Sequence, residues 1–297
     1  MSENINDYVI IDQEPPSLID KLKSIPMTYY IAGANIFVFI MIHLTNFFIG
    51  DNWLLMQLWK STPDIALNGQ SYRLLTAVFT HNELMHILGN CMGLIILGRP
   101  IEQIFGKWKL LIIFLVSGLF GSLASFIFSP AYAIGASGGV FGLFGVHFYL
   151  LMINKKVYLK VFGNEIFKLL LLNVLIGFTV SGIDYYGHFG GIFGGFLATL
   201  ALGLNHKIKF NKRFFAVSIA MLVIFFGSFS YVKSNYVNFI NDFETNMNQF
   251  NTAANANDLH ALKEARDNYK QSIPHLPPIP NTDYVLEQLD QIIKKAE

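Results

Sequence analysis

Three short polar clusters interrupt the apolar stretches of this sequence, at residues 81–90, 135–139 and 187–195. Polar and ionisable side chains within apolar segments are costly, so they mark candidate functional sites. In the first cluster, His86 and Asn90 are four residues apart and would project from the same face of a helix. They suit a pair of hydrogen-bond donors better than a metal site, because asparagine is a poor ligand for transition metals and no H-E-x-x-H pattern is present. Hydrogen bonding between helices explains this cluster equally well when it is taken alone.

The second cluster places Ser137 between glycines, directly after a loop and directly before an apolar segment. A serine at the start of a helix has an accessible hydroxyl. The free backbone N–H groups beside it can bind a developing oxyanion, with help from the helix dipole. The string G-x-S-G is common, however, and alone it favours an N-cap or a helix-packing site.

The third cluster begins with His188 and continues with Gly191 and Gly195, which occupy one stripe of a helix. Small residues on one stripe let a second helix approach closely, and Gly145 lies on roughly the same face of its segment as Ser137. We therefore expect the two helices to pack together and to bring Ser137 close to His188. A serine, a histidine that can take its proton and separate oxyanion donors are the components of acyl transfer by a nucleophilic serine.

The composition indicates a membrane protein rather than a soluble one. Only 14% of the 297 residues are charged, 53% are hydrophobic and 28 are phenylalanine, whereas soluble domains average about 25% charged residues. The net charge of +1 leaves no electrostatic footprint for nucleic acid. The single cysteine, Cys91, excludes an internal disulfide framework and any multi-cysteine zinc or iron–sulfur site. We expect neither a cofactor nor a metal.

Seven apolar segments are candidate membrane-spanning helices. They cover residues 27–48, 84–104, 110–129, 137–153, 166–183, 187–204 and 213–232. The chain thus divides into a polar, cytoplasmic leader (1–26), a six-span core (27–204), a connector with a seventh span (205–232) and an extracytoplasmic helical tail (233–297). With the N-terminus in the cytoplasm, the inner segments carry twelve Lys and Arg residues and the outer loops carry two. This asymmetry places the three clusters near the outer face of the cell membrane.

Together these motifs make residues 72–195 resemble the rhomboid family of intramembrane serine proteases. The string H-x-x-x-x-H-x-x-x-N is present at 81–90, G-x-S-G at 135–138 and H-x-x-G-x-x-x-G at 188–195. The resemblance implies an all-α membrane protein with a six-helix core, here with one extra C-terminal transmembrane helix. It implies Ser137 as nucleophile, His188 as general base, and the Ser137 N–H, His86 and Asn90 as the oxyanion hole. Supporting roles are implied for Gly135, Gly138, Phe141, Gly145, Gly191, Gly195, Arg73 and Glu102.

Two positions depart from the family pattern. Tyr72 stands where the family has a tryptophan before Arg73 in the first outer loop. Phe141 stands where many members have a tyrosine that stacks on the catalytic histidine, so the aromatic face is kept and the hydroxyl is lost. Asp184 lies four residues before His188, and we expect a solvated loop acid there rather than the third member of a triad.

The resulting hypothesis is a serine endopeptidase that cleaves transmembrane segments of other membrane proteins near the outer face of the bilayer. Its partners would be single-span or other membrane proteins and the lipid bilayer, with neither nucleic acid nor metal. The alternative is a catalytically inactive rhomboid-like protein that binds or chaperones clients, and the presence of both Ser137 and His188 argues against it. A transporter is a weaker alternative, because Arg99 and Glu102 lie near the inner end of one segment rather than at the midplane.

Overall fold

The computed structural model of the chain describes residues 24–179, 182–204, 208–274, 278–279 and 281–297, and these residues are mostly helical. In chain order the helices are α2 (Met27–Ile49), α3 (Trp53–Leu58), α4 (Thr62–Ala66), α5 (Arg73–Thr76), η2 (Ala77–Phe79), α6 (Leu84–Phe105), α7 (Lys107–Phe128), α8 (Ser137–Ile153), α9 (Lys155–Phe162), α10 (Glu165–Thr179), α11 (Tyr185–Leu202), α12 (Lys212–Asn255), α13 (Leu259–Ser272) and α14 (Thr282–Ala296). Extended pairing within the described ranges amounts to one antiparallel bridge, between Lys60 and Ala133. The leader expected at 1–26 lies, up to residue 23, outside the described residues.

Each of the seven apolar segments coincides with a helix: α2, α6, α7, α8, α10, α11 and α12. Four of them, α2, α6, α7 and α12, are long and apolar enough to cross a bilayer. The others, α8, α10 and α11, have 17, 15 and 18 residues, about 22–27 Å at the usual rise per residue. That is slightly less than a hydrocarbon core of about 30 Å. The architecture is therefore all-helical with several apolar helices, and the count of seven spans stays a prediction. The fifth predicted segment also includes residues 180–181, which lie outside the described ranges.

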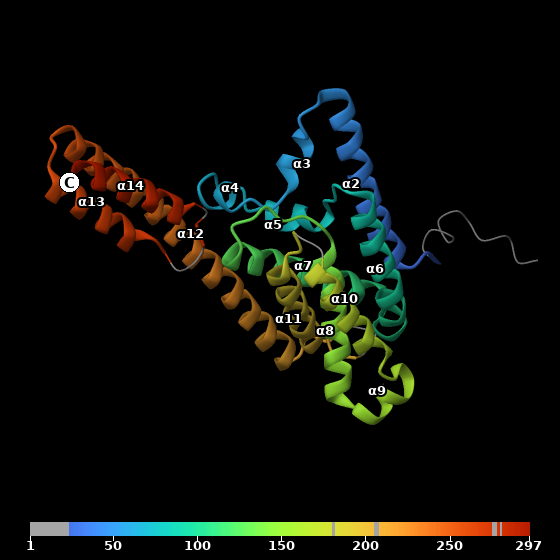
Figure 1. Cartoon of the computed structure of the whole chain (residues 1–297). Coiled ribbons are helices and arrows are strands. Elements are labelled where there is room, and N and C mark those ends of the chain that lie inside the picture. The colour runs from blue at the N-terminus through green and yellow to red at the C-terminus, as the bar shows by residue number, and fades with distance from the viewer. Residues whose placement is uncertain (1–23, 180–181, 205–207, 275–277, 280) are drawn as a thin grey trace, which may run out of the picture.

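Helices α7, α8 and α11 pack against one another at the centre of the molecule (Figure 1). Glycines make the contact between α8 and α11. A methyl group at Gly191 or at Gly195 would overlap the carbonyl oxygen of Gly138 or of Gly142, respectively. A methyl group at Gly145 would likewise overlap the backbone of α11. Because the neighbouring atoms belong to the backbone, they cannot move aside as the end of a side chain can, and close approach requires glycine at these positions.

The start of α2 is held by Glu102 of α6. One carboxylate oxygen accepts the Met27 N–H at 2.7 Å, and the other accepts the N–H and the hydroxyl of Thr28 at 3.1 and 2.7 Å. The first N–H groups of a helix have no partner within it, and a negative charge there also suits the helix dipole. Arg99 lies 3.6 Å from the same carboxylate. Glu102 is twelve residues beyond Asn90, about 18 Å along α6, so it acts on the fold away from the polar clusters.

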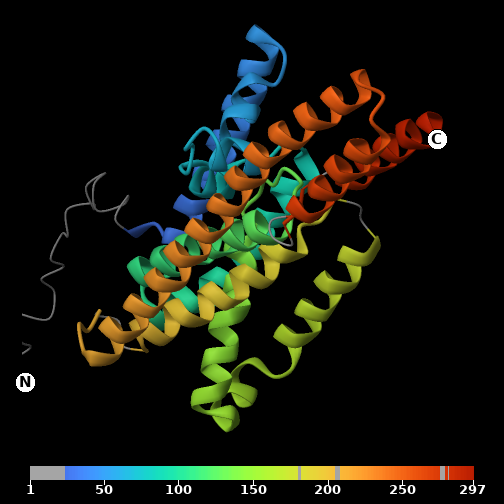
Figure 2. The same cartoon turned by 90° about the vertical axis from the view of Figure 1, so that its left-hand side faces the viewer.

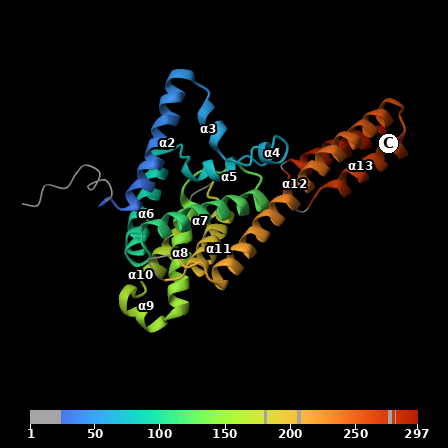
Figure 3. The same ribbon diagram turned by 180° about the vertical axis from the view of Figure 1, so that it is seen from behind.

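The 44 residues of α12 form one continuous helix, about 66 Å long and about twice the thickness of a hydrocarbon core. Its C-terminal half extends beyond the other apolar helices and carries α13 and α14 alongside it (Figures 2 and 3). Buried side chains between these three helices are Phe239, Phe250, Leu262, Tyr269, Leu289 and Ile293. A second cluster joins α12 to α4, α5 and α7 through Ile65, Leu74, Phe126, Val232 and Tyr236. The expected boundary between seventh span and tail, at residue 232, therefore lies inside a single helix.

Candidate active site

Ser137 is the first residue of α8 and follows the connection 129–136 from the end of α7. The connection enters the helix through Gly135, whose φ of 117° is one that residues with side chains rarely adopt. The Gly135 N–H donates to the Ala77 carbonyl oxygen over 2.9 Å. A methyl group at Gly135 would also lie 2.6 Å from His86 Nε2. Glycine is required here for two independent reasons, and it brings the chain just before Ser137 against the His86 ring.

His188 lies in the first turn of α11 and stacks on Phe141 of α8. The ring centroids are 3.9 Å apart and the ring planes differ by 9°. Phe141 follows Ser137 by four residues, so the two side chains share one face of α8. The stack therefore holds the histidine ring on the helix face that carries the serine hydroxyl. Phenylalanine can make this contact because the ring face, and not a hydroxyl, supplies it.

His81, a member of the first string, links the predicted oxyanion donors to the connection before Ser137. Its Nε2 accepts from Asn90 Nδ2 over 2.9 Å and from the Ala136 N–H over 3.3 Å. The His81 side chain is fully buried and meets the His86 ring edge-on at 4.9 Å. Burial, and secondly repulsion from His86, lowers the pKa of His81 to about 4. A neutral imidazole has a free acceptor nitrogen, so His81 stays in the form that accepts both bonds. Sequence reasoning assigned no separate role to this residue.

Asp184 is the N-cap of α11 and differs from the solvated loop acid that we expected. Its Oδ1 accepts the Gly187 N–H over 3.0 Å, which satisfies one free donor at the start of the helix that carries His188. The side chain also lines a cavity of about 30 Å³ together with Ser122, Ser137 and Gly187. A cavity of this size holds about one water molecule.

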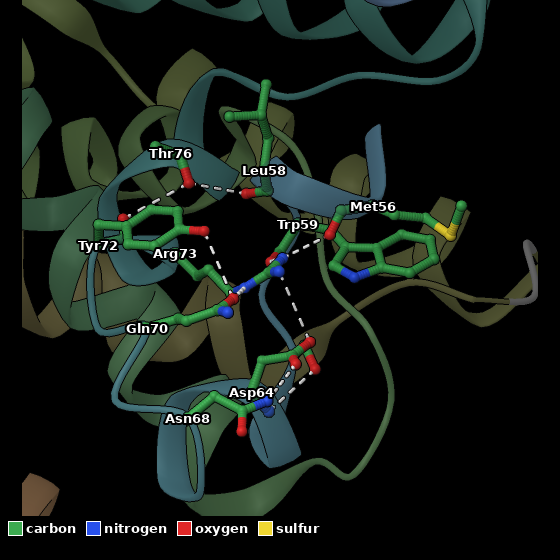
Figure 4. Close-up of polar contacts among 10 residues, drawn as sticks. Met56, Leu58, Trp59, Asp64, Asn68, Gln70, Tyr72, Arg73 and Thr76 are labelled. Atoms are coloured by element: carbon green, nitrogen blue, oxygen red, sulfur yellow. Dashed lines mark hydrogen bonds and ion pairs between the residues drawn. The ribbon is translucent and has the colours of Figure 1, made fainter. Parts of the chain in front are cut away.

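The segment between α2 and α6, residues 50–83, is held together by Arg73, which is 3% exposed (Figure 4). Its Nη1 donates to the carbonyl oxygens of Met56 and Trp59, and its Nε donates to Gln70 Oε1 over 2.6 Å. Its Nη2 lies 3.6 Å from an Asp64 carboxylate oxygen. One guanidinium thus joins α3, α4 and α5, three short helices of this segment.

The described residues bring three predicted sites together: the start of α8, the start of α11 and the His86–Asn90 turn of α6. Arg73 and Glu102 hold neighbouring elements instead. Within the same described ranges, no group of three or more His, Cys, Asp or Glu side chains could hold a metal ion. The arrangement offers a hydroxyl, an imidazole and several hydrogen-bond donors, which are the components of acyl transfer by a nucleophilic serine.

Comparison with known proteins matches residues 68–205 of the chain to the model of the rhomboid domain. The chain is 34% identical over 204 residues to the rhomboid protease GluP of Bacillus subtilis. The aligned region covers 67% of this chain and 40% of GluP. It is 32% identical over 146 residues to the putative rhomboid protease YdcA of the same organism, which covers 47% of this chain and 73% of YdcA. It is also 34% identical over 150 residues to RHOMBOID-like protein 7 of Arabidopsis thaliana, covering 48% and 47% of the two chains.

Proposed function

This chain belongs to the rhomboid family, and from that premise we propose that it is an intramembrane serine protease with Ser137 as nucleophile and His188 as general base. The observation that carries the proposal is the stack of His188 on Phe141, one helical turn beyond Ser137. A stacked imidazole loses rotational freedom before substrate arrives, which supports a role for His188 in proton transfer. The family match covers the segment from the first outer loop to the end of α11.

In the proposed reaction, His188 removes the hydroxyl proton of Ser137 as the serine oxygen attacks the carbonyl carbon of a substrate peptide bond. The resulting oxyanion collapses, the C–N bond breaks, and the leaving amine takes the proton from His188. Water then repeats the sequence on the acyl-enzyme and releases the carboxylic acid. The cavity beside Ser137 and Asp184 is large enough for about one such water molecule.

Three groups are proposed to stabilise the oxyanion: the Ser137 N–H, His86 and Asn90. Asn90 has two amide hydrogens, and His81 accepts one of them, which leaves the other for a substrate oxygen. His86 faces Gly135, two residues before the nucleophile. Removal of one donor from an oxyanion hole typically slows a reaction by about 100-fold to 1,000-fold. Asn90 is held by its bond to His81, and His86 and Asn90 are both carried by α6, so these two donors need little rearrangement.

The proposed substrates are transmembrane segments of other membrane proteins, cleaved near the outer face of the bilayer. A regular helix hides its carbonyl groups in its own hydrogen bonds, so the substrate must unwind locally to be attacked. The excess of Lys and Arg in the inner segments supports an orientation with the N-terminus in the cytoplasm and with α13 and α14 outside. A seven-span arrangement is part of the same proposal.

A serine-reactive fluorophosphonate tests the proposal on the full chain in proteoliposomes. We expect mass spectrometry to find the phosphonyl group on Ser137, and labelling to disappear in Ser137→Ala and to fall strongly in His188→Ala. Ser122→Ala is the matched control because Ser122 lines the same cavity, and its labelling should equal that of the wild type. Absence of labelling on Ser137 in a folded protein that still binds membrane clients would favour the inactive, client-binding alternative.

A further inference from the structure

Lys60, in the first outer loop between α3 and α4, has a fully buried side chain. Its Nζ donates to the carbonyl oxygens of Ala131, Ser129 and Ser125, at 2.6, 3.0 and 3.4 Å. Its own backbone pairs with Ala133 in both directions, at 2.9 and 3.2 Å. Side chain and backbone of this one residue therefore bind a segment more than sixty positions away along the chain.

The segment that Lys60 binds leads directly into the nucleophile. Ser125 lies in the last turn of α7, where its carbonyl oxygen also accepts the Ser129 N–H over 2.9 Å. Ser129 is the C-cap, at the end of the helix that carries the negative end of the dipole. Ala131 and Ala133 belong to the connection that ends at Ser137. Beside Lys60, the rings of Trp59 and Tyr132 stack with centroids 4.4 Å apart. Lys60 thus fastens the upstream half of this connection, while the Gly135 and Ala136 amides are held further along.

The buried charge works against stability, so packing alone does not account for it. Burial lowers the pKa of Lys60 to about 8, and the Asp184 carboxylate partly opposes the shift. An apolar side chain of the same length would avoid the cost of dehydrating an ammonium group. What an apolar chain cannot do is donate hydrogen bonds to three carbonyl groups at once.

We propose that Lys60 is a positioning residue that sets the conformation of the 129–136 connection and thereby the placement of Ser137. This inference rests on the proposed function for its catalytic consequence. The effect on the connection itself can be measured without catalysis.

Lys109 provides a matched control, because it is a second buried lysine that binds carbonyl groups at the end of a helix. Its Nζ donates to the Leu202 and Gly203 carbonyl oxygens at 2.7 and 2.8 Å, at the end of α11 far from His188. Lys60→Met and Lys109→Met each remove a buried ammonium group that donates to backbone carbonyl oxygens. A purely structural role predicts that both variants lose activity only in proportion to their loss of stability.

The test compares the two variants in proteoliposomes well below their unfolding temperatures. For Lys60→Met we expect kcat and the rate of Ser137 labelling to fall by about 100-fold, the size of effect that a misplacement of about 1 Å produces, with KM within about 2-fold of wild type. Hydrogen exchange should accelerate in residues 129–136. For Lys109→Met we expect less than about a 3-fold change in kcat, and unchanged exchange in this segment.

Wild-type kcat and wild-type exchange in folded Lys60→Met would overturn the proposal, as would an equal loss of kcat in both variants. If Lys60→Met does not fold, Lys60→Gln takes its place. Glutamine has two N–H donors on a shorter, neutral side chain, too few for three carbonyl oxygens, so we expect kcat to fall and exchange in residues 129–136 to accelerate. Wild-type values of both would overturn the proposal. Cleavage that persists in Ser137→Ala would instead refute the proposed function. The exchange comparison would still test the role of Lys60 in that case.

Discussion

The close approach of α8 and α11 can be tested by Gly191→Ala. Alanine in place of glycine favours a helix by about 1 kcal/mol. At Gly191, however, the methyl group would overlap the Gly138 carbonyl oxygen and lie 2.8 Å from its carbon. Overpacking of this kind costs about 1–3 kcal/mol, so we expect a net loss of stability of no more than about 2 kcal/mol. An ordinary contact is restored only if the helices separate by about 1 Å, and a misplacement of that size costs about 100-fold in rate.

The assay measures kcat/KM on a labelled single-span substrate in proteoliposomes, together with the thermal unfolding of each variant. Gly227→Ala in α12 is the matched control, because a methyl group there meets nothing within 4 Å. We expect this control to be fully active and as stable as the wild type or slightly more so. If Gly191→Ala cleaves at the wild-type rate while folded, the contact between the helix backbones does not position Ser137 against His188.

Three further predictions concern single side chains. Glu102→Ala should lower the free energy of unfolding by about 3 kcal/mol or more, because it leaves buried donors at the start of α2 without an acceptor. Gln103 is exposed, so Gln103→Ala should leave the free energy of unfolding unchanged in the same assay. Phe141→Tyr should keep kcat near wild type, whereas Phe141→Leu should lower it about 10-fold by removing the stack on His188. Because burial lowers the pKa of His81 from its ordinary value of 6.5 to about 4 in the folded chain, stability should be fully present above pH 6.5 and fall by about 3 kcal/mol towards pH 4.

Each of these predictions has a result that contradicts it. Equal unfolding free energies for the wild type and Glu102→Ala would mean that water replaces the carboxylate. Wild-type kcat in Phe141→Leu would mean that stacking does not orient His188. The acid-induced loss of stability should be smaller in His81→Gln, which keeps an acceptor for Asn90 without titrating. An unchanged loss in that variant would assign the acid sensitivity to other groups.

The apolar segments and the three polar clusters were predictable from the sequence because they follow local rules. A run of apolar residues predicts a helix within a membrane protein, and all seven runs coincide with helices. The glycine stripe at Gly191 and Gly195 predicted contact with the Ser137 helix, and those glycines meet the backbone of α8. The continuity of α12 was less evident, since its asparagine-rich second half has the composition of a polar tail.

Contacts of Lys60 and His81, which span long sequence distances, and the local cap at Asp184 were not predicted in this way. From the sequence, Lys60 is only one of the two basic residues of the predicted outer loops, because its carbonyl partners lie 65 to 71 positions further along the chain. His81 stood within a recognised string, but its bond to Ala136 spans 55 positions. Asp184 was expected to be solvated, whereas its carboxylate caps the next helix. Every residue except proline has the same backbone N–H and C=O groups, so the backbone partner of a distant side chain has no sequence signature and only the folded chain reveals it.

The central claim is that Ser137 cleaves the transmembrane segments of other membrane proteins. The most direct test co-reconstitutes the full chain with a labelled single-span protein in liposomes and follows the fragments by mass spectrometry. The account predicts one cut near the outer end of the substrate segment, abolished in Ser137→Ala and in His188→Ala while both variants remain folded. Cleavage at the same bond by Ser137→Ala would contradict the account.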